Sequence, residues 1–165
     1  MAKVKEIRFF HKARVMESGD QEKETVSGIC QKCGFAAAGS LCALCRSRLE
    51  AEEQRTVFQH LRQKPWLRWQ DLHQQAELRF IDDEVFQAIR RRYMAQIKDD
   101  LRQYAFEFAQ EKPNPACLAK AQKTAHFYAT MKLACAPDQL TIAAVRGALG
   151  RWRYEAIFKT KQDGK

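Results

Sequence analysis

Four cysteines of this chain lie close together in the sequence and have the spacing of metal ligands. They form two Cys-x-x-Cys pairs, Cys30/Cys33 and Cys42/Cys45, with eight residues between the pairs. A Cys-x-x-Cys turn lets both thiolates face one point, and two such turns joined by a short hairpin supply four sulfurs in a tetrahedron. We therefore predict one structural zinc ion, because a shell of four thiolates leaves no coordination position open for catalysis.

The residues around the pairs agree with this prediction, although other uses of the cysteines stay open. Gly34 directly follows the second cysteine, where a left-handed backbone is often needed to finish the turn. Disulfides would require an oxidising compartment, and we see no secretory signal. A redox Cys-x-x-Cys usually occurs as a single pair beside a βαβ unit, whereas this chain has two such pairs close together. An iron centre with four thiolates would have the same spacing, so spacing alone does not separate iron from zinc.

From about residue 28 to residue 46, the chain resembles the zinc-ribbon and zinc-knuckle modules. The shared features are C-x2-C-G, a short hairpin, and an apolar residue, Leu41, before the second C-x2-C. The resemblance covers about a tenth of the chain, and the loop between the pairs is shorter than in many ribbons. It implies a bound metal but no particular activity, since such modules occur in nucleic-acid-binding proteins, polymerase-associated factors and protein–protein adaptors.

Two strands are expected next to this motif. Residues 3–15 alternate between apolar and charged side chains, which is the pattern of a half-buried strand. Residues 25–29 can return as a second strand that leads into Cys30. His11 lies on the apolar face of the first strand, and we interpret it as a core histidine rather than a metal ligand. Residues 1–46 are thus predicted to form one module, a β-strand with a zinc ribbon.

After the fourth cysteine, the apolar residues recur with a helical period. The predicted helices cover residues 47–64, 66–78, 82–111, 114–133 and 138–159. The strongest pattern is that of the third helix, where apolar residues recur every three or four positions without glycine or proline. The predicted fold class is therefore α+β, mainly α, with a small N-terminal β element followed by a bundle of about five helices over residues 47–165.

Several residues are expected to begin helices or to face the core. Ser47 is a candidate cap for the first helix, and Asn114 with Pro115 is a typical start for the fourth. In the last helix, an apolar stripe at spacings of three and four predicts a buried face. Its members are Ile142, Val145, Leu149, Trp152 and Ala156. Trp152 is accordingly expected in the core rather than at the surface.

The composition limits the possible classes of protein. With 165 residues, 45% of them hydrophobic, the chain can bury a sizeable core and is not a disordered protein. No apolar run approaches the length of a membrane span, so we expect no membrane partner. We expect the protein to be cytoplasmic, because cysteine thiols stay reduced in the cytoplasm.

The positive charge of the chain is concentrated at its C-terminal end. The net charge is +9, and residues 113–165 carry nine basic and three acidic side chains, or +6, whereas residues 51–112 are neutral overall. A basic end on a neutral middle suggests an anionic partner, and nucleic acid, either DNA or RNA, is the commonest one. The alternative is that the basic surface only aids solubility.

Basic residues in two parts of the chain are our candidates for phosphate contacts, because guanidinium groups bind phosphate well. The candidates are Arg90, Arg91, Arg146, Arg151, Arg153, Lys159 and Lys161. The run of three arginines that begins at Arg90 could equally form a solvated helix face.

We find no P-loop, dinucleotide fingerprint, zinc-protease motif or nucleophile elbow, and therefore predict no catalytic residues, no small-molecule substrate and no enzyme. The function we expect is that of a non-enzymatic, zinc-stabilised nucleic-acid-binding protein, either alone or as a subunit of a larger nucleoprotein or regulatory complex. A variant of this hypothesis uses residues 46–93 as a helix-turn-helix. The alternative function is a protein–protein adaptor that docks a polymerase or a replication factor through its helical bundle.

Overall fold

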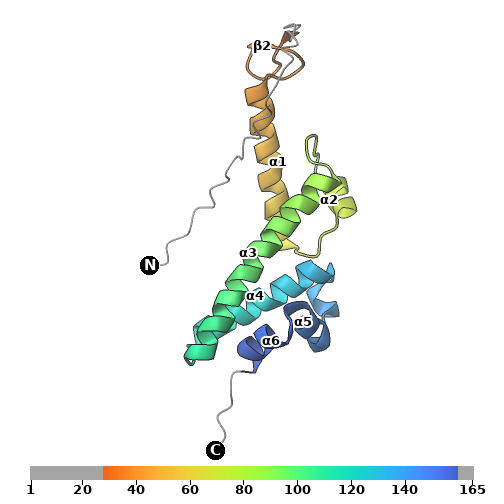
Figure 1. Cartoon of the computed structure of the whole chain (residues 1–165). Helices are drawn as coiled ribbons and strands as arrows, with labels where there is room; N and C mark the ends of the chain where they lie inside the picture. Colours follow the sequence, from red (N-terminus) through yellow and green to blue (C-terminus); the bar gives the residue numbers. More distant parts are fainter. Residues whose placement is uncertain (1–27, 160–165) are drawn as a thin grey trace, which may run out of the picture. The chain divides into compact units, whose positions relative to one another are not determined.

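The computed structural model of the chain describes residues 28–159 (Figure 1). The predicted strand over residues 3–15, including His11, lies outside the described residues, as does most of the strand predicted over residues 25–29. By the density of its internal contacts, the chain divides into two compact units, residues 1–42 and residues 43–165. The module boundary that the sequence suggested at residue 46 stays a prediction.

The first unit contains a short antiparallel hairpin. Strand β1 (Gly28–Ile29) pairs with strand β2 (Ala36–Ala37), with Gly28 opposite Ala37 and Ile29 opposite Ala36. Few side chains of this hairpin are buried: Cys30 and Ala37 are, whereas Ile29 is 70% exposed. A sheet of two-residue strands has too little apolar surface to be stable alone, so other interactions must hold it.

The second unit is helical. Its elements are α1 (Ala43–Gln63), α2 (Trp69–Gln75), α3 (Asp83–Gln110), α4 (Pro115–Leu133), a single 3-10 turn η1 (Pro137–Gln139), α5 (Ile142–Leu149) and α6 (Arg151–Phe158). Together with the small sheet, these elements confirm the predicted class, α+β and mainly α. Over residues 28–159 the chain has six α-helices, one more than the sequence pattern suggested.

Two of the helix starts follow the expected capping chemistry. Asp82 precedes α3, and its Oδ1 accepts a hydrogen bond of 2.8 Å from the backbone N–H of Val85. Asn114 precedes α4, and its Oδ1 accepts from Ala116 at 2.7 Å, with Pro115 as the first helical residue. Each cap satisfies a backbone donor that has no partner inside the helix. The cap at Asn114 was predicted, whereas Asp82 was expected in the first turn of its helix rather than at the cap.

The start of α1 was predicted wrongly. The helix begins at Ala43, directly after Cys42, and Ser47 lies inside it rather than at its cap. The second Cys-x-x-Cys pair therefore enters a helix instead of forming a separate turn. Residues three apart in a helix share one face, so a helical first turn positions Cys42 and Cys45 as well as a loop would.

The segment predicted as one last helix, residues 138–159, is divided at Gly150. This glycine has φ 82° and ψ 153°, a conformation that side chains with a Cβ rarely adopt. The axis changes there, and the single stripe expected from the sequence is interrupted. Val145 and Leu149 are buried as predicted, but Trp152 is 52% exposed and Ile142 is 75% exposed, so their predicted burial is wrong.

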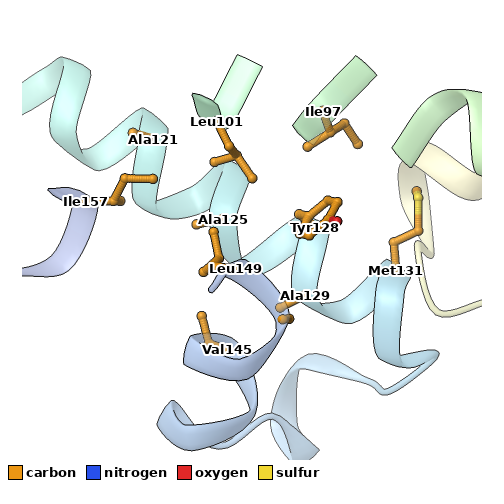
Figure 2. Packing of buried hydrophobic residues seen from close by; sticks show 11 residues of the cluster. Ile97, Leu101, Ala121, Ala125, Tyr128, Ala129, Met131, Val145, Leu149 and Ile157 are labelled. Atoms are coloured by element: carbon orange, nitrogen blue, oxygen red, sulfur yellow. The ribbon is translucent and has the colours of Figure 1, made fainter. Parts of the chain in front are cut away.

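Two apolar clusters stabilise the helical unit. The larger one lies where α4, α5 and α6 pack against the C-terminal half of α3, and Figure 2 shows its members. Its fully buried side chains include Leu101, Ala121, Ala125, Ala129, Met131 and Ile157. The small alanine side chains of α4 allow its neighbours to approach closely.

The second cluster joins α1, α2 and the N-terminal end of α3. Its completely buried members are Val57, Leu61, Leu72 and Phe86. Tyr93 packs against both clusters, with its ring centroid 4.6 Å from that of Phe58 and 5.8 Å from that of Phe127. None of the helices described here combines the length and the apolar character that crossing a membrane requires.

Candidate metal centre and candidate nucleic-acid interface

The first cysteine pair lies in a tight turn between β1 and β2. The backbone N–H of Gly34 donates to the carbonyl of Cys30 at 2.9 Å, and the N–H of Cys30 donates to the carbonyl of Phe35 at 2.7 Å. Gly34 has φ 76°, the left-handed conformation predicted for the residue after the second cysteine. A glycine is required there because other residues pay a steric cost for a positive φ.

The four sulfur atoms form one compact group. The sulfurs of Cys30, Cys33, Cys42 and Cys45 all lie within 4.8 Å of one another. Cys33 and Cys42 have a sulfur–sulfur separation of 3.6 Å, far longer than the roughly 2.05 Å of a disulfide bond. A zinc ion bonded to four sulfurs at about 2.3 Å would separate them by about 3.8 Å, so the group has the size of a tetrahedral shell. The four cysteines could therefore hold one metal ion.

The local electrostatics favour the thiolate form of Cys30. The backbone N–H of Cys42 donates to the sulfur of Cys30, and further N–H groups of the turn add to it, which lowers the pKa of Cys30 to about 6 although burial acts in the opposite direction. Cys30 and Cys45 are buried, whereas Cys33 is exposed. Because thiolates are the form that binds metals, the lowered pKa suits Cys30 to metal binding.

The helical unit has an open groove where α5 meets α6. It has a volume of about 790 Å³ and is lined by Ile142, Arg146, Gly150, Arg151, Tyr154 and Lys159, among others. The break at Gly150 forms this groove, because it turns the chain between the two short helices. Three of the predicted phosphate-binding residues, Arg146, Arg151 and Lys159, are thus brought together, and we call this surface the basic groove.

Glu155 organises the arginines of the basic groove. Its Oε1 accepts from Nε of Arg151 at 3.0 Å and lies 3.9 Å from Nη2 of Arg146. The hydrogen bond from Arg151 is the main reason why the pKa of Glu155 is below its ordinary value. The side chains of Arg146 and Arg151 remain 48% and 80% exposed, so one carboxylate orients two guanidinium groups that an anion can still reach.

Two other predicted phosphate ligands have structural contacts instead. Arg90 is half-buried; its Nη1 donates to the carbonyl of Leu67 at 3.4 Å and its Nη2 donates to the carbonyl of Met131. Burial, together with the nearby charge of Arg68, lowers the pKa of Arg90. This guanidinium therefore joins α3 to the loop before α2 and to α4, a role that the sequence did not reveal because its partners are far away along the chain.

Arg153 is the second such residue. Its Nη1 donates to the carbonyl of Leu149 at 2.7 Å, across the break at Gly150, and its Nε is buried. Arg153 thus supports the turn between α5 and α6 and does not line the basic groove. Of the other candidates, Arg91 is exposed on α3 and outside the groove, and Lys161 lies beyond the described residues.

Tyr154 lines the basic groove. Sequence reasoning missed the exposure of Trp152, which it assigned to the buried stripe of the last predicted helix. The sequence signal for this exposure was the pair of glycines, Gly147 and Gly150, within that predicted helix. Gly150 has the positive φ, whereas Gly147 is an ordinary helical residue.

Within residues 28–159, the cysteine group is the only set of three or more potential metal ligands that lie close together. His73 and His126 pack edge-on against Trp69 and Phe158, with ring centroids 5.4 Å apart in each case. Compared with protein-family models, with curated proteins and with solved structures, the chain showed no match.

Proposed function

We propose that this chain is a non-enzymatic nucleic-acid-binding protein whose N-terminal hairpin is stabilised by one structural zinc ion. The observation that carries the proposal is the basic groove, in which Arg146, Arg151 and Lys159 gather beside Tyr154. The chain as a whole has a net charge of +9, which favours the approach of a polyanion. The partner is DNA or RNA, bound by the chain alone or as a subunit of a larger nucleoprotein complex.

The arrangement of the groove supports phosphate binding in particular. Glu155 holds the two arginines beside each other, so less side-chain freedom is lost when a phosphate binds. Arginine can donate two parallel hydrogen bonds to one phosphate, and lysine adds a mobile positive charge. Sequence-independent contacts of this kind make affinity strongly dependent on salt.

The metal we propose is zinc, in a structural role. Four thiolates match the closed tetrahedral shell of structural zinc sites, and all four ligands come from this chain. When bound, the ion would link the turn of the first pair to the residues of the second pair. The cysteines themselves would act as fixed anchors for a hairpin that buries few other side chains.

The proposal is tested by removing the charges of the groove. In the triple variant R146Q/R151Q/K159Q, we expect nucleic-acid affinity to fall steeply and the slope of log K against log salt to become shallower by about 2 to 3, because about 0.7 to 0.9 of a counterion is released per phosphate contact. The matched control is R55Q/K64Q/R68Q, which removes three exposed charges outside the groove. Equal affinities of the two variants and the unchanged protein would contradict the proposal.

A second candidate function is a protein–protein adaptor, and one observation favours it. Ile29 and Phe35, on the hairpin, are 70% and 74% exposed, and exposed apolar side chains often mark a protein contact. If the adaptor function holds, I29S/F35S abolishes capture of a partner protein while nucleic-acid binding is absent even at low salt. Capture that is unaffected by I29S/F35S would exclude the hairpin as the docking surface.

A further inference from the structure

A second groove lies on the other side of α6, between that helix and α3. It has a volume of about 670 Å³ and is lined by Asp99, Arg102, Gln103, Phe106 and Trp152. We call it the aromatic groove, because Phe106 is 60% exposed and Trp152 is 52% exposed. Two large aromatic side chains in one open groove are unusual at the surface of a water-soluble domain and suggest a ligand with a flat apolar face.

The exposure of Trp152 is not caused by poor packing of α6. The helix buries Ile157 completely and partly buries Tyr154 and Phe158, which pack against the larger apolar cluster. With this face of α6 in the core, Trp152 points away from it, toward α3 and Phe106. The core of the unit would remain intact if Trp152 were smaller, so packing does not explain why the residue is a tryptophan.

The two grooves differ in charge. In the aromatic groove, Asp99 lies 3.7 Å from Arg102, so the carboxylate and the guanidinium neutralise each other. Three positive side chains, Arg146, Arg151 and Lys159, line the basic groove, and the carboxylate that pairs with the two arginines, Glu155, is not among the lining residues. Arg151 and Trp152 are adjacent in the sequence, so α6 carries a phosphate-binding side chain into one groove and an aromatic side chain into the next.

We propose that the aromatic groove binds the unpaired bases of single-stranded nucleic acid, while the phosphates of the same strand lie along the basic groove. The inference rests on the proposed function and narrows its ligand from nucleic acid in general to single strands. Proteins that bind single strands combine a positive track for the backbone with aromatic side chains on which bases stack. In a duplex, the base faces are already stacked on each other and cannot reach Trp152 or Phe106.

The dimensions agree with this arrangement. Arg151 and Trp152 line different grooves but belong to the same helix, α6, and a helix with its side chains is about 10 Å wide. A stacked strand rises about 3.4 Å per nucleotide, so three or four nucleotides cover that distance. The neutral character of the aromatic groove favours bases there over phosphates, which the basic groove attracts more strongly.

The test compares single-stranded and duplex oligonucleotides of about 20 nucleotides, using the full-length, metal-loaded protein and fluorescence anisotropy. We expect tighter binding of single-stranded DNA or RNA than of duplex. In F106A/W152A, we expect affinity for single strands to fall about 10- to 100-fold, because each lost stacking contact weakens binding several-fold or more. Affinity for duplex should stay unchanged, since the basic groove is intact.

Two further variants make the result specific. W152F keeps an aromatic ring and should retain most of the affinity. The difference in tryptophan emission between W152F and the unchanged protein is the emission of Trp152, and its change on binding shows whether a base quenches that residue. L133A removes a 44% exposed apolar side chain of α4 outside both grooves and should behave like the unchanged protein. Unfolding of F106A/W152A is not expected, because neither side chain is in a buried cluster.

The outcomes separate this inference from the proposed function. If single strands and duplex bind equally well and F106A/W152A changes neither affinity, the aromatic groove does not bind bases, although the proposed function stands. If R146Q/R151Q/K159Q and F106A/W152A both leave binding unchanged, both proposals are wrong. Loss of binding to a protein partner, rather than to nucleic acid, in F106A/W152A would show that the groove is a protein-docking surface.

Discussion

Single charged side chains hold several loops of this protein through hydrogen bonds to distant backbone groups. The carboxylate of Glu53, on α1, accepts from the N–H of Arg79 at 2.9 Å and from the N–H of Phe80 at 2.8 Å. These two residues belong to the loop that leads into α3. Arg90 likewise donates hydrogen bonds to the backbone carbonyl groups of Leu67 and Met131. Backbone N–H and C=O groups that are shielded from water need hydrogen-bond partners, so losing these contacts would destabilise the folded protein.

Replacing Glu53 tests the importance of one such contact. We expect E53A to lower the free energy of unfolding by about 1–2 kcal/mol, because two hydrogen bonds to a charged acceptor are lost at a partly exposed site. E53Q should cost less, since an amide keeps one acceptor oxygen. Urea denaturation followed by circular dichroism measures the difference. E52Q, at an exposed neighbouring position, is the control, and equal losses in E52Q and E53A would contradict the argument.

At the scale of the element, Gly150 determines what the C-terminal region can do. With φ 82° and ψ 153°, it separates α5 from α6, and the break both opens the basic groove and leaves Trp152 at the surface. A continuous helix would place residues 142, 145, 149, 152 and 156 on one face, as the sequence pattern suggests. One backbone conformation therefore decides between a buried tryptophan and an exposed one.

We expect G150A to lower the free energy of unfolding by about 1–3 kcal/mol, because alanine is strained in this region of backbone space. The matched control is G147A in α5, where a Cβ would meet open space; it should raise stability by up to about 1 kcal/mol. Thermal denaturation gives both values. Trp152 emission and its quenching by acrylamide report on exposure, and a G150A variant as stable as G147A would show that the break is not held by glycine.

The ion pairs of Glu155 add a dependence on pH to the same element. The folded protein lowers the pKa of this carboxyl below its ordinary value of 4.5, chiefly through the hydrogen bond from Arg151. Since the ionised form is favoured in the folded state, its contribution is present above the ordinary pKa and is lost as the pH falls through the lowered pKa. The contribution is small, because the pair is exposed and screened by salt.

The expected result concerns the difference in Tm between the unchanged protein and E155Q. The unchanged protein should have the higher Tm at about pH 7. The difference should diminish below about pH 4.5, and it should also shrink at high salt. A Tm difference that is constant from acidic to neutral pH would contradict the role assigned to the carboxylate.

At the scale of the whole molecule, the sequence predicted the features that depend on local chemistry. The group of four cysteines that could hold a metal ion, the left-handed Gly34 and the cap Asn114 are each determined by residues within a few positions of one another. The contacts of Arg90 and Glu53 could not be predicted, because their partners lie more than 20 residues away and are backbone atoms. The position of Trp152 was missed because periodicity assumes a continuous helix.

The last prediction concerns how the two units depend on the metal. The helical unit has two apolar clusters built without any of the four cysteine ligands, whereas the hairpin buries little besides Cys30 and Ala37. Removal of the metal by a chelator should therefore leave most of the helical circular dichroism in place. Hydrogen exchange over residues 28–42 should accelerate strongly, because a structural metal contributes its binding free energy directly to folding.

Matched cysteine variants separate this effect from a general loss of thiols. C30S should lose the bound zinc, measured by elemental analysis, and show the same local exchange as the chelated protein. C117S, outside the cysteine group, should retain one equivalent of zinc and normal exchange. If chelation instead unfolded all helices in one cooperative transition, the metal would be needed for the core of the helical unit as well. Retention of the metal in C30S would show that the four cysteines do not act together as its ligands.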